Sequence, residues 1–136
     1  MTRNKSLLST VFVLLLMIVG PSLVTPQDPA VVNAKTIKVK LENDKVRVLE
    51  ATLQPGEKEQ MHSHPAYVIY VLEGGKARSH TPDGKTSDQE FKTGDVIYRD
   101  PLTHWAENIG TTTIHLILVE LKNPTKPTAI QPAANN

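Results

Sequence analysis

The side chains best suited to chemistry in this chain are its five histidines: His62, His64, His80, His104 and His115. The chain has no cysteine. Disulfides, thiolate zinc sites, thiol nucleophiles and a lipid-modified N-terminal cysteine are therefore excluded. A metal ion or cofactor would have to be held by imidazole, carboxylate or backbone groups. The sequence suggests no Ser-His-Asp arrangement, phosphate-binding glycine loop or paired-carboxylate site.

His62 and His64 form a His-X-His pair. Residues two apart in a strand project from the same face, and Pro65 follows where a strand can end or bulge. Two imidazoles directed inward would have to be desolvated and hydrogen-bonded, and a bound metal ion turns that cost into a gain. The pair alone is equally compatible with a surface or core role without metal.

The elements that must position these histidines are short strands. Period-two alternation, or apolar character on both faces, marks five stretches: 37–41, 46–53, 67–72, 95–99 and 113–121. Turn signals separate them, Gly74-Gly75 being interpreted as a hairpin turn, and no 10-residue amphipathic helix is present. This pattern predicts an all-β sandwich or barrel. Strands that are apolar on both faces would lie between the core and a covering layer.

Residues 1–24 do not belong to that unit. Arg3 and Lys5 precede an apolar run from Leu7 to Val24, which is typical of a secretory signal peptide. The run is also just long enough to span a bilayer as an uncleaved anchor, whereas a buried helix would lack a partner helix downstream. Basic residues before the run place the remainder outside the cytoplasm in either case. We therefore expect a periplasmic or secreted protein, or one anchored by this segment.

Domain organisation and charge follow from the same division. We expect a linker at 25–34, the folded domain at 35–122 and a disordered, proline-rich tail at 123–136. Residues 1–24 hold 14 of the 53 apolar residues, and removing them changes the net charge from +1 to −1, with 13 basic and 14 acidic residues left. Without basic blocks the chain lacks the charge that nucleic-acid binding needs. We expect no nucleic-acid partner, and contact with a membrane only through an uncleaved N-terminal segment.

Two motifs resemble those of the cupin superfamily. The first family motif runs Gly, five residues, His-X-His, three or four residues, Glu, six residues, Gly. Here Gly56 and Gly75 bound the corresponding stretch, with His62-Ser63-His64 at the expected spacing. The second family motif ends in His, three residues and Asn, as His104 and Asn108 do here, and Gly94 begins it. The resemblance covers about 39–121 and implies a cupin-type jelly roll, a double-stranded β-helix barrel.

Carried over residue by residue, the resemblance implies His62, His64 and His104 as metal ligands. Val68 stands where the family has a glutamate, so the fourth protein ligand is absent. The second motif is also one residue short before His104. Three imidazoles leave coordination positions open, as in a catalytic site, and some cupin dioxygenases that act on thiols or diketones similarly use three histidines alone. The expected cofactor is a divalent ion of Fe, Mn, Zn, Ni or Cu.

Several other residues near the motifs have expected roles of their own. Asn108 could either hydrogen-bond near it or cap a turn, and Trp105 should pack in the core or between sheets, opposite His104. We expect His80 at an exposed hairpin end and His115 as a core or edge histidine. Packing is the expected role of the strand tyrosines, of which at most one or two can line the cavity: Tyr67, Tyr70 and Tyr98. The motifs offer no carboxylate on the inward face, so no catalytic residue is assigned.

These features predict an exported, metal-binding cupin-domain protein. Its ion would retain its positive charge and favour a small anionic molecule, and the chemistry expected of an enzyme is that of a dioxygenase or isomerase. One alternative is a non-catalytic module that binds a metal ion or small molecule. Another is a structural homodimer with a vestigial site, paired through apolar outward strand faces such as 67–72.

Overall fold

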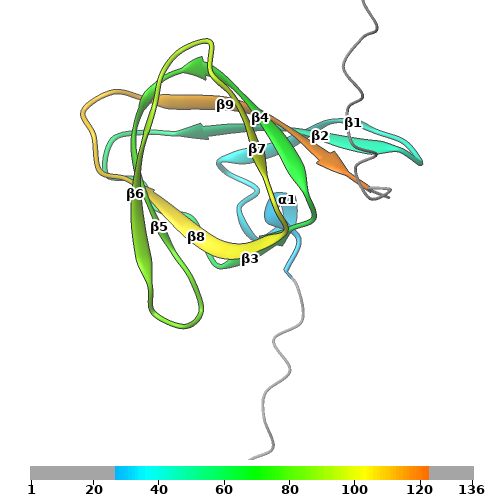
Figure 1. Ribbon diagram of the computed structural model, residues 1–136, viewed down its shortest axis with the longest axis horizontal. Coiled ribbons are helices and arrows are strands. Elements are labelled where there is room, and N and C mark those ends of the chain that lie inside the picture. Colours follow the sequence, from blue (N-terminus) through cyan, green and yellow to red (C-terminus); the bar gives the residue numbers. More distant parts are fainter. Residues whose placement is uncertain (1–26, 123–136) are drawn as a thin grey trace, which may run out of the picture.

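The computed structural model describes residues 27–122 (Figure 1). The predicted signal or anchor at 1–24 and the predicted tail at 123–136 lie outside the described residues. In the described part, no helix is long and apolar enough to cross a membrane.

Residues 27–122 form nine strands and one short helix. Their bounds are α1 Pro29–Val32, β1 Ile37–Glu42, β2 Val46–Leu53, β3 His62–His64, β4 Tyr67–Glu73, β5 Gly75–His80, β6 Thr86–Phe91, β7 Val96–Arg99, β8 Leu102–Asn108 and β9 Ile114–Leu121. All five strands expected from the alternation are present, and the all-β prediction is confirmed.

The strands form two antiparallel sheets that face each other (Figure 1). One sheet has the order β1-β2-β9-β4-β7 and the other the order β3-β8-β5-β6. The neighbours β2 and β9, and likewise β3 and β8, are far apart in the sequence. These crossing connections produce the jelly roll that the motif resemblance implied.

The chain crosses from one sheet to the other at Gly74. Strand β4 pairs with β7 and β9, whereas β5 pairs with β6 and β8. The prediction of a hairpin turn at Gly74-Gly75 is therefore wrong. A Cβ atom at Gly74 would collide with the backbone carbonyl oxygen of Phe91, so glycine is needed here for a close backbone approach.

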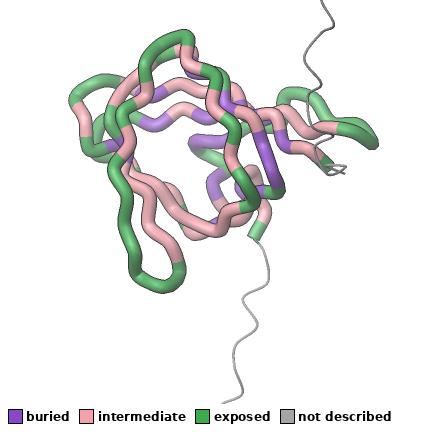
Figure 2. Tube along the Cα trace, viewed as in Figure 1, coloured by how far each residue is buried: buried purple, intermediate pink, exposed green. Residues whose placement is uncertain are grey.

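The core lies on the inward side of the five-stranded sheet. Figure 2 shows buried residues gathered on β2, β4 and β9. The largest buried cluster is Ile37, Leu49, Ala51, Tyr67, Ile69, Val71 and Leu118. The sequence predicted a layer that covers the outer side of this sheet. In the described part of the chain that side is open instead, because Tyr70 and Val96 are exposed on it.

The segment expected as a linker contributes to the domain. Asp28 caps α1 by accepting a hydrogen bond from the Ala30 amide at 2.8 Å. Just after this helix, the buried Asn33 side chain bonds the backbone of Gln60, with its Oδ1 accepting from the Gln60 amide at 2.6 Å. The ordered unit thus begins before residue 35, and α1 lies against the approach to β3.

Candidate metal centre

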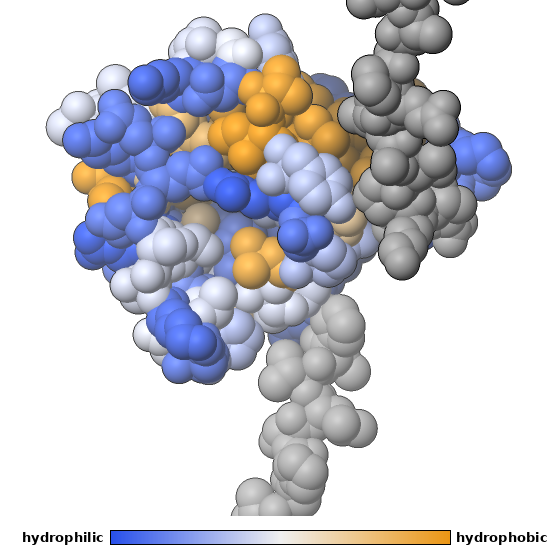
Figure 3. All heavy atoms as spheres, in the orientation of Figure 1, coloured by the Kyte–Doolittle hydropathy of each residue, from blue (hydrophilic) through white to orange (hydrophobic). Residues whose placement is uncertain are grey.

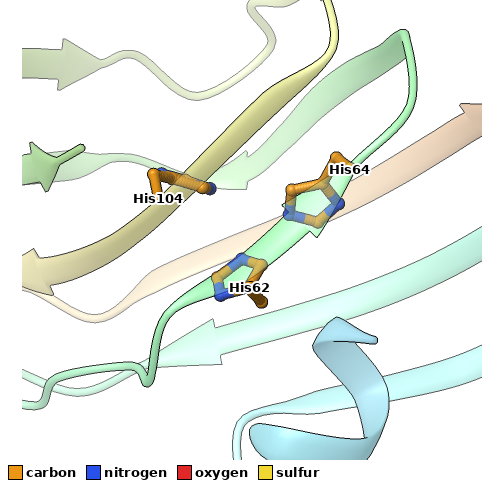
Figure 4. Close-up of side chains that lie close together, drawn as sticks. All are labelled: His62, His64 and His104. Atoms are coloured by element: carbon orange, nitrogen blue, oxygen red, sulfur yellow. The ribbon is translucent and has the colours of Figure 1, made fainter. Parts of the chain in front are cut away.

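Two paired strands bring the three predicted ligands together. Strands β3 and β8 are antiparallel neighbours, and His62 lies directly opposite His104. His64 projects from the same face of β3 two residues later. One ring nitrogen of each imidazole lies within 4.8 Å of one in each of the others. Figure 4 shows the three rings on the neighbouring strands β3 and β8. The relative exposure of His62 is 1% and that of His64 is 5%, so the pair points into the barrel.

Each of these imidazoles uses Nδ1 for a contact with the protein. The contacts are His62 with the Gln60 carbonyl oxygen at 2.7 Å, His64 with Glu120 Oε1 at 2.7 Å and His104 with Ser79 Oγ at 2.9 Å. Anchoring Nδ1 in this way leaves Nε2 as the nitrogen available to a metal ion. The Nε2 atom of His104 is buried and has no hydrogen-bond partner among the described residues. Such an orphaned nitrogen is what a metal ligand requires, so the donor set fits a divalent ion.

Burial keeps two of the ligands neutral. It lowers the pKa of His62 to about 4. Burial also lowers the pKa of His104, with smaller contributions from the charges of His62 and His64, to about 3. Both rings are therefore unprotonated at neutral pH, the state that metal binding needs.

Glu120 is a buried carboxylate that the sequence analysis missed. Its side chain is 4% exposed, and it accepts the hydrogen bond from His64 across β9 and β3. Arg47 lies 3.8 Å away from its other oxygen. Glu120 lies outside both motifs, so the prediction about the motifs did not cover it. Period-two alternation was the available signal, because Ile114, Leu118 and Glu120 share one face of β9.

Glu59 is a second inward carboxylate and lies within the first motif, so the prediction that the motifs offer no inward carboxylate is wrong. Its Oε2 lies 4.0 Å from His62 Nε2, and its side chain is only 9% exposed. Burial raises its pKa to about 7, although a backbone hydrogen bond from Ala106 opposes this. Glu59 lies before β3, outside the strands that alternation predicts, so no periodicity indicated its direction. Its amide donates a hydrogen bond to the Ala106 carbonyl oxygen at 2.9 Å. A carboxyl group with this pKa can donate or accept a proton near neutral pH.

Val68 does not face the cluster. On β4 the buried, inward residues are Tyr67, Ile69 and Val71, and Val68 lies on the other face. The ring centroids of Tyr67 and His64 are 4.7 Å apart. In the described part of the chain the metal-type cluster thus consists of the three histidines alone, without a carboxylate from β4.

A cavity of about 430 Å³ adjoins the cluster. Its polar lining includes the three histidines together with Glu59, Ser79, Ser87, Gln89, Tyr98, Arg99 and Asp100. Its apolar lining includes Ile37, Leu53, Ile69, Phe91, Ile114, Leu116 and Leu118. Tyr67 also lines it, and burial raises the pKa of this phenol to about 12, so the hydroxyl stays protonated. The volume is suited to a small organic molecule.

Asn108 has the turn role, one of the two alternatives considered for it. Its side chain is buried and donates to the carbonyl oxygens of Leu53 and Thr112, both at 2.8 Å. It also accepts from the Gly110 amide at 2.9 Å. Asn108 is not part of the cavity lining.

The remaining histidines lie away from the cluster. His115 on β9 contacts Glu50 on β2 at 2.9 Å, and both side chains lie on the outer face of the five-stranded sheet. His80 stacks on Trp105, with ring centroids 3.7 Å apart, and contacts Glu107 at 3.0 Å. Trp105 therefore lies on the outer side of its sheet rather than in the core or between sheets. Trp105 projects from the face of β8 opposite to that of His104, as expected. It packs there on the His80 ring.

Comparisons with known proteins agree with this architecture. A family model described as a cupin domain matches residues 49–120. No curated protein matches the sequence. Among solved structures, the chain is similar to a cupin domain from Bordetella pertussis, with 25% identity and a TM-score of 0.59, over 64% of this chain and 92% of that one.

Two further structures show the same fold. A cupin-family protein with a double-stranded β-helix fold from Methanocaldococcus jannaschii has 15% identity and a TM-score of 0.51, over 62% of this chain and 77% of that one. A double-stranded β-helix protein from Klebsiella pneumoniae has 24% identity and a TM-score of 0.50, over 64% and 76%. The family model covers more than half of the sequence, and the fold and motifs agree with it. The chain therefore belongs to the cupin domain family.

Proposed function

We propose that the protein binds a divalent metal ion through His62, His64 and His104 and holds a small anionic molecule in the adjoining cavity. The observation that carries this proposal is the unpartnered, buried Nε2 of His104, next to two other buried imidazoles whose Nδ1 atoms are anchored. Three protein ligands leave coordination positions for a further molecule. Imidazole ligands suit Zn, Cu, Fe and Ni, and Mn is the fifth candidate ion.

The chemistry that this site supports best is oxygen-dependent or isomerising chemistry. A bound divalent ion would supply Lewis acidity and orient the molecule. Glu59 lines the same cavity and could hold or accept a proton beside that molecule. Tyr67 presents a neutral hydroxyl to the same cavity.

Metal analysis tests the proposal. The domain is purified metal-free, incubated in turn with Fe, Mn, Zn, Ni and Cu, desalted and analysed for metal content. We expect one ion per chain in the wild type and its loss in His62→Ala and His104→Ala. His115→Ala is the matched control, because His115 lies on the outer face and should leave the metal content unchanged. A wild type that stays metal-free, or His104→Ala with full metal content, would overturn the proposal.

Oxygen consumption separates an enzyme from a binding module. The iron-loaded domain is given a panel of thiols and diketones, and uptake is recorded with an oxygen electrode. Uptake that disappears in His104→Ala supports a dioxygenase. No uptake from a stoichiometrically loaded sample favours the non-catalytic module that binds a metal ion or small molecule.

We also propose that the protein is exported and acts in the periplasm or outside the cell. Support comes from the basic start and the apolar run at 7–24. Sequencing the N-terminus of the mature protein tests this. A soluble form that still begins at Met1 or Thr2 contradicts a cleaved signal, and a membrane-bound form with an intact N-terminus indicates the anchor.

A homodimer is proposed from the outer face of the five-stranded sheet. Tyr70 and Val96 are cross-strand neighbours on β4 and β7, and their relative exposures are 46% and 70%. Figure 3 shows apolar atoms gathered over these two strands. Exposed apolar patches of this kind are typical of protein interfaces. Sedimentation of the wild type should give a dimer and that of Val96→Lys a monomer; a monomeric wild type contradicts the proposal.

A further inference from the structure

Arg99 links the free edges of the two sheets. It is the last residue of β7, the edge strand of the five-stranded sheet, and its guanidinium donates a hydrogen bond to Gln89 Oε1. Gln89 belongs to β6, the edge strand of the other sheet. Because these two strands do not pair, this contact lies at the open side of the barrel. Both side chains line the cavity.

Arg99 also differs from the other arginines in the described part of the chain. Arg47 lies 2.9 Å from Asp28, and Arg78 lies 2.6 Å from Asp88. No carboxylate of residues 27–122 lies within 4.0 Å of the Arg99 guanidinium, whose hydrogen-bond partner is a neutral amide. Arginine presents a planar set of donors that matches a carboxylate. An anion could therefore take the place that Gln89 now holds.

The charge of Arg99 acts inside the cavity. Among residues 27–122, no lysine and no other arginine lines the cavity. Two carboxylates also line the cavity. Asp100 is exposed, and Glu59 lies beside His62. Arg99 is thus the permanently charged cation of the cavity lining. Of the two acidic side chains in that lining, Asp100 lies at an exposed position and Glu59 lies next to the histidine cluster.

The remaining wall is apolar. Aliphatic and aromatic side chains from β2, β4, β6 and β9 line it: Leu53, Ile69, Phe91, Ile114, Leu116 and Leu118. Leu53, Ile114 and Leu118 are each no more than 6% exposed, so this wall is part of the packed core. A fully polar ligand would gain no hydrophobic contact with this wall. Each methylene group that a ligand buries there contributes about 0.8 kcal/mol, or about fourfold in affinity.

We propose that the cavity binds a small organic anion with an apolar tail, and that Arg99 is the residue that selects the anionic group. This inference deepens the proposed function, on which it rests for the role of the cavity. The carboxylate or similar group lies on Arg99, and the tail lies against the apolar wall. The histidine cluster then faces the same molecule.

Titration calorimetry on the metal-free full chain tests this without relying on the metal. The probes are acetate, hexanoate and hexanamide. We expect hexanoate to bind at least about tenfold more tightly than hexanamide, because a charge-assisted contact is stronger than a neutral one. We also expect it to bind at least about tenfold more tightly than acetate, because of its four additional methylene groups. Equal affinity for hexanoate and hexanamide, or equal affinity for hexanoate and acetate, overturns the proposal.

Variants then assign the contact. Arg99→Gln should weaken hexanoate binding about tenfold, whereas Arg78→Gln, which removes an arginine from the outer face, should change it less than twofold. Gln89→Ala removes the competing partner and should retain hexanoate binding. If Arg99→Gln fails to fold, the affinities of the wild type for hexanoate and hexanamide still test whether the cavity prefers an anionic group. Metal binding without hexanoate binding contradicts this inference alone, and hexanoate binding without metal binding contradicts the metal proposal alone.

Discussion

Nδ1 of His64 donates a hydrogen bond to Oε1 of Glu120 at 2.7 Å, and both side chains are almost fully buried. The contact joins β3 of one sheet to β9 of the other. It fixes the ring orientation and the tautomer in which Nε2 has a free lone pair. The carboxylate also increases the basicity of the imidazole as a ligand.

Replacing this carboxylate should weaken metal binding. For Glu120→Gln we expect about a tenfold to hundredfold loss of Zn²⁺ affinity, the range found when such outer partners are removed. Competition with a chromophoric chelator measures it. Glu50→Gln is the matched control, because Glu50 contacts His115 on the outer face at a similar distance of 2.9 Å. Equal affinities in the two variants would show that Glu120 does not support the site.

Ser79 should have the same role toward His104, but with a smaller effect. Ser79→Ala removes the partner of Nδ1, which lies 2.9 Å from the hydroxyl, and we expect about a tenfold loss of Zn²⁺ affinity. Ser87→Ala is the control. That residue also lines the cavity but makes no side-chain hydrogen bond to a histidine in the described part of the chain. A larger loss in Ser87→Ala than in Ser79→Ala would contradict this role.

The metal-free protein should lose stability as the pH falls from 6.5 to 4.5. Unfolded histidine binds a proton below about pH 6.5, whereas folded His62 and His104 do so only near pH 4 and 3, so acid favours the unfolded state. Each contributes up to about 1.4 kcal/mol per pH unit. Glu59 acts in the opposite direction, because its pKa is raised from 4.5 to about 7. The net slope should therefore approach about 1.4 kcal/mol per unit.

Urea unfolding at pH 6.5, 5.5 and 4.5 measures this slope. Glu59→Gln removes the opposing group and should make the slope about twice as steep. In His104→Gln the slope should become shallower. A free energy of unfolding that is constant or rises toward pH 4.5 in the wild type would contradict the buried, neutral state of both histidines.

Asn108 should matter for stability and not for metal binding. Asn108→Ala removes three side-chain hydrogen bonds of a buried residue, which at about 1 kcal/mol each predicts a loss of about 3 kcal/mol in the free energy of unfolding. Asn43→Ala is the control, because Asn43 makes similar turn contacts at an exposed position and should cost about 1 kcal/mol or less. Chemical unfolding measures both variants. A folded Asn108→Ala protein with much weaker Zn²⁺ affinity would assign Asn108 to the site instead.

The sequence predicted the strands and the ligand set because both depend on local patterns. Period-two alternation marks β2, β4 and β9, and the spacing of His62 and His64 places them on one face of β3. The addition of His104 required the motif resemblance, since the pairing of β3 with β8 is not visible in local spacing. The prediction of a turn at Gly74-Gly75 was wrong because a turn and a crossing between sheets both favour glycine.

The tertiary structure decided which other side chains reach the cluster. Glu120, Ser79 and Arg99 lie on three different strands, and they meet the histidines or the cavity only because the sheets face each other. Glu59 precedes β3, and its pKa near 7 arises from burial. The sequence by itself determined an all-β chain with a set of three histidines fit for a metal ion. The neutral charge state of His62 and His104, the ring orientation of His64 and the charged lining of the cavity were decided by tertiary structure, because desolvation and long-range contacts exist only after folding.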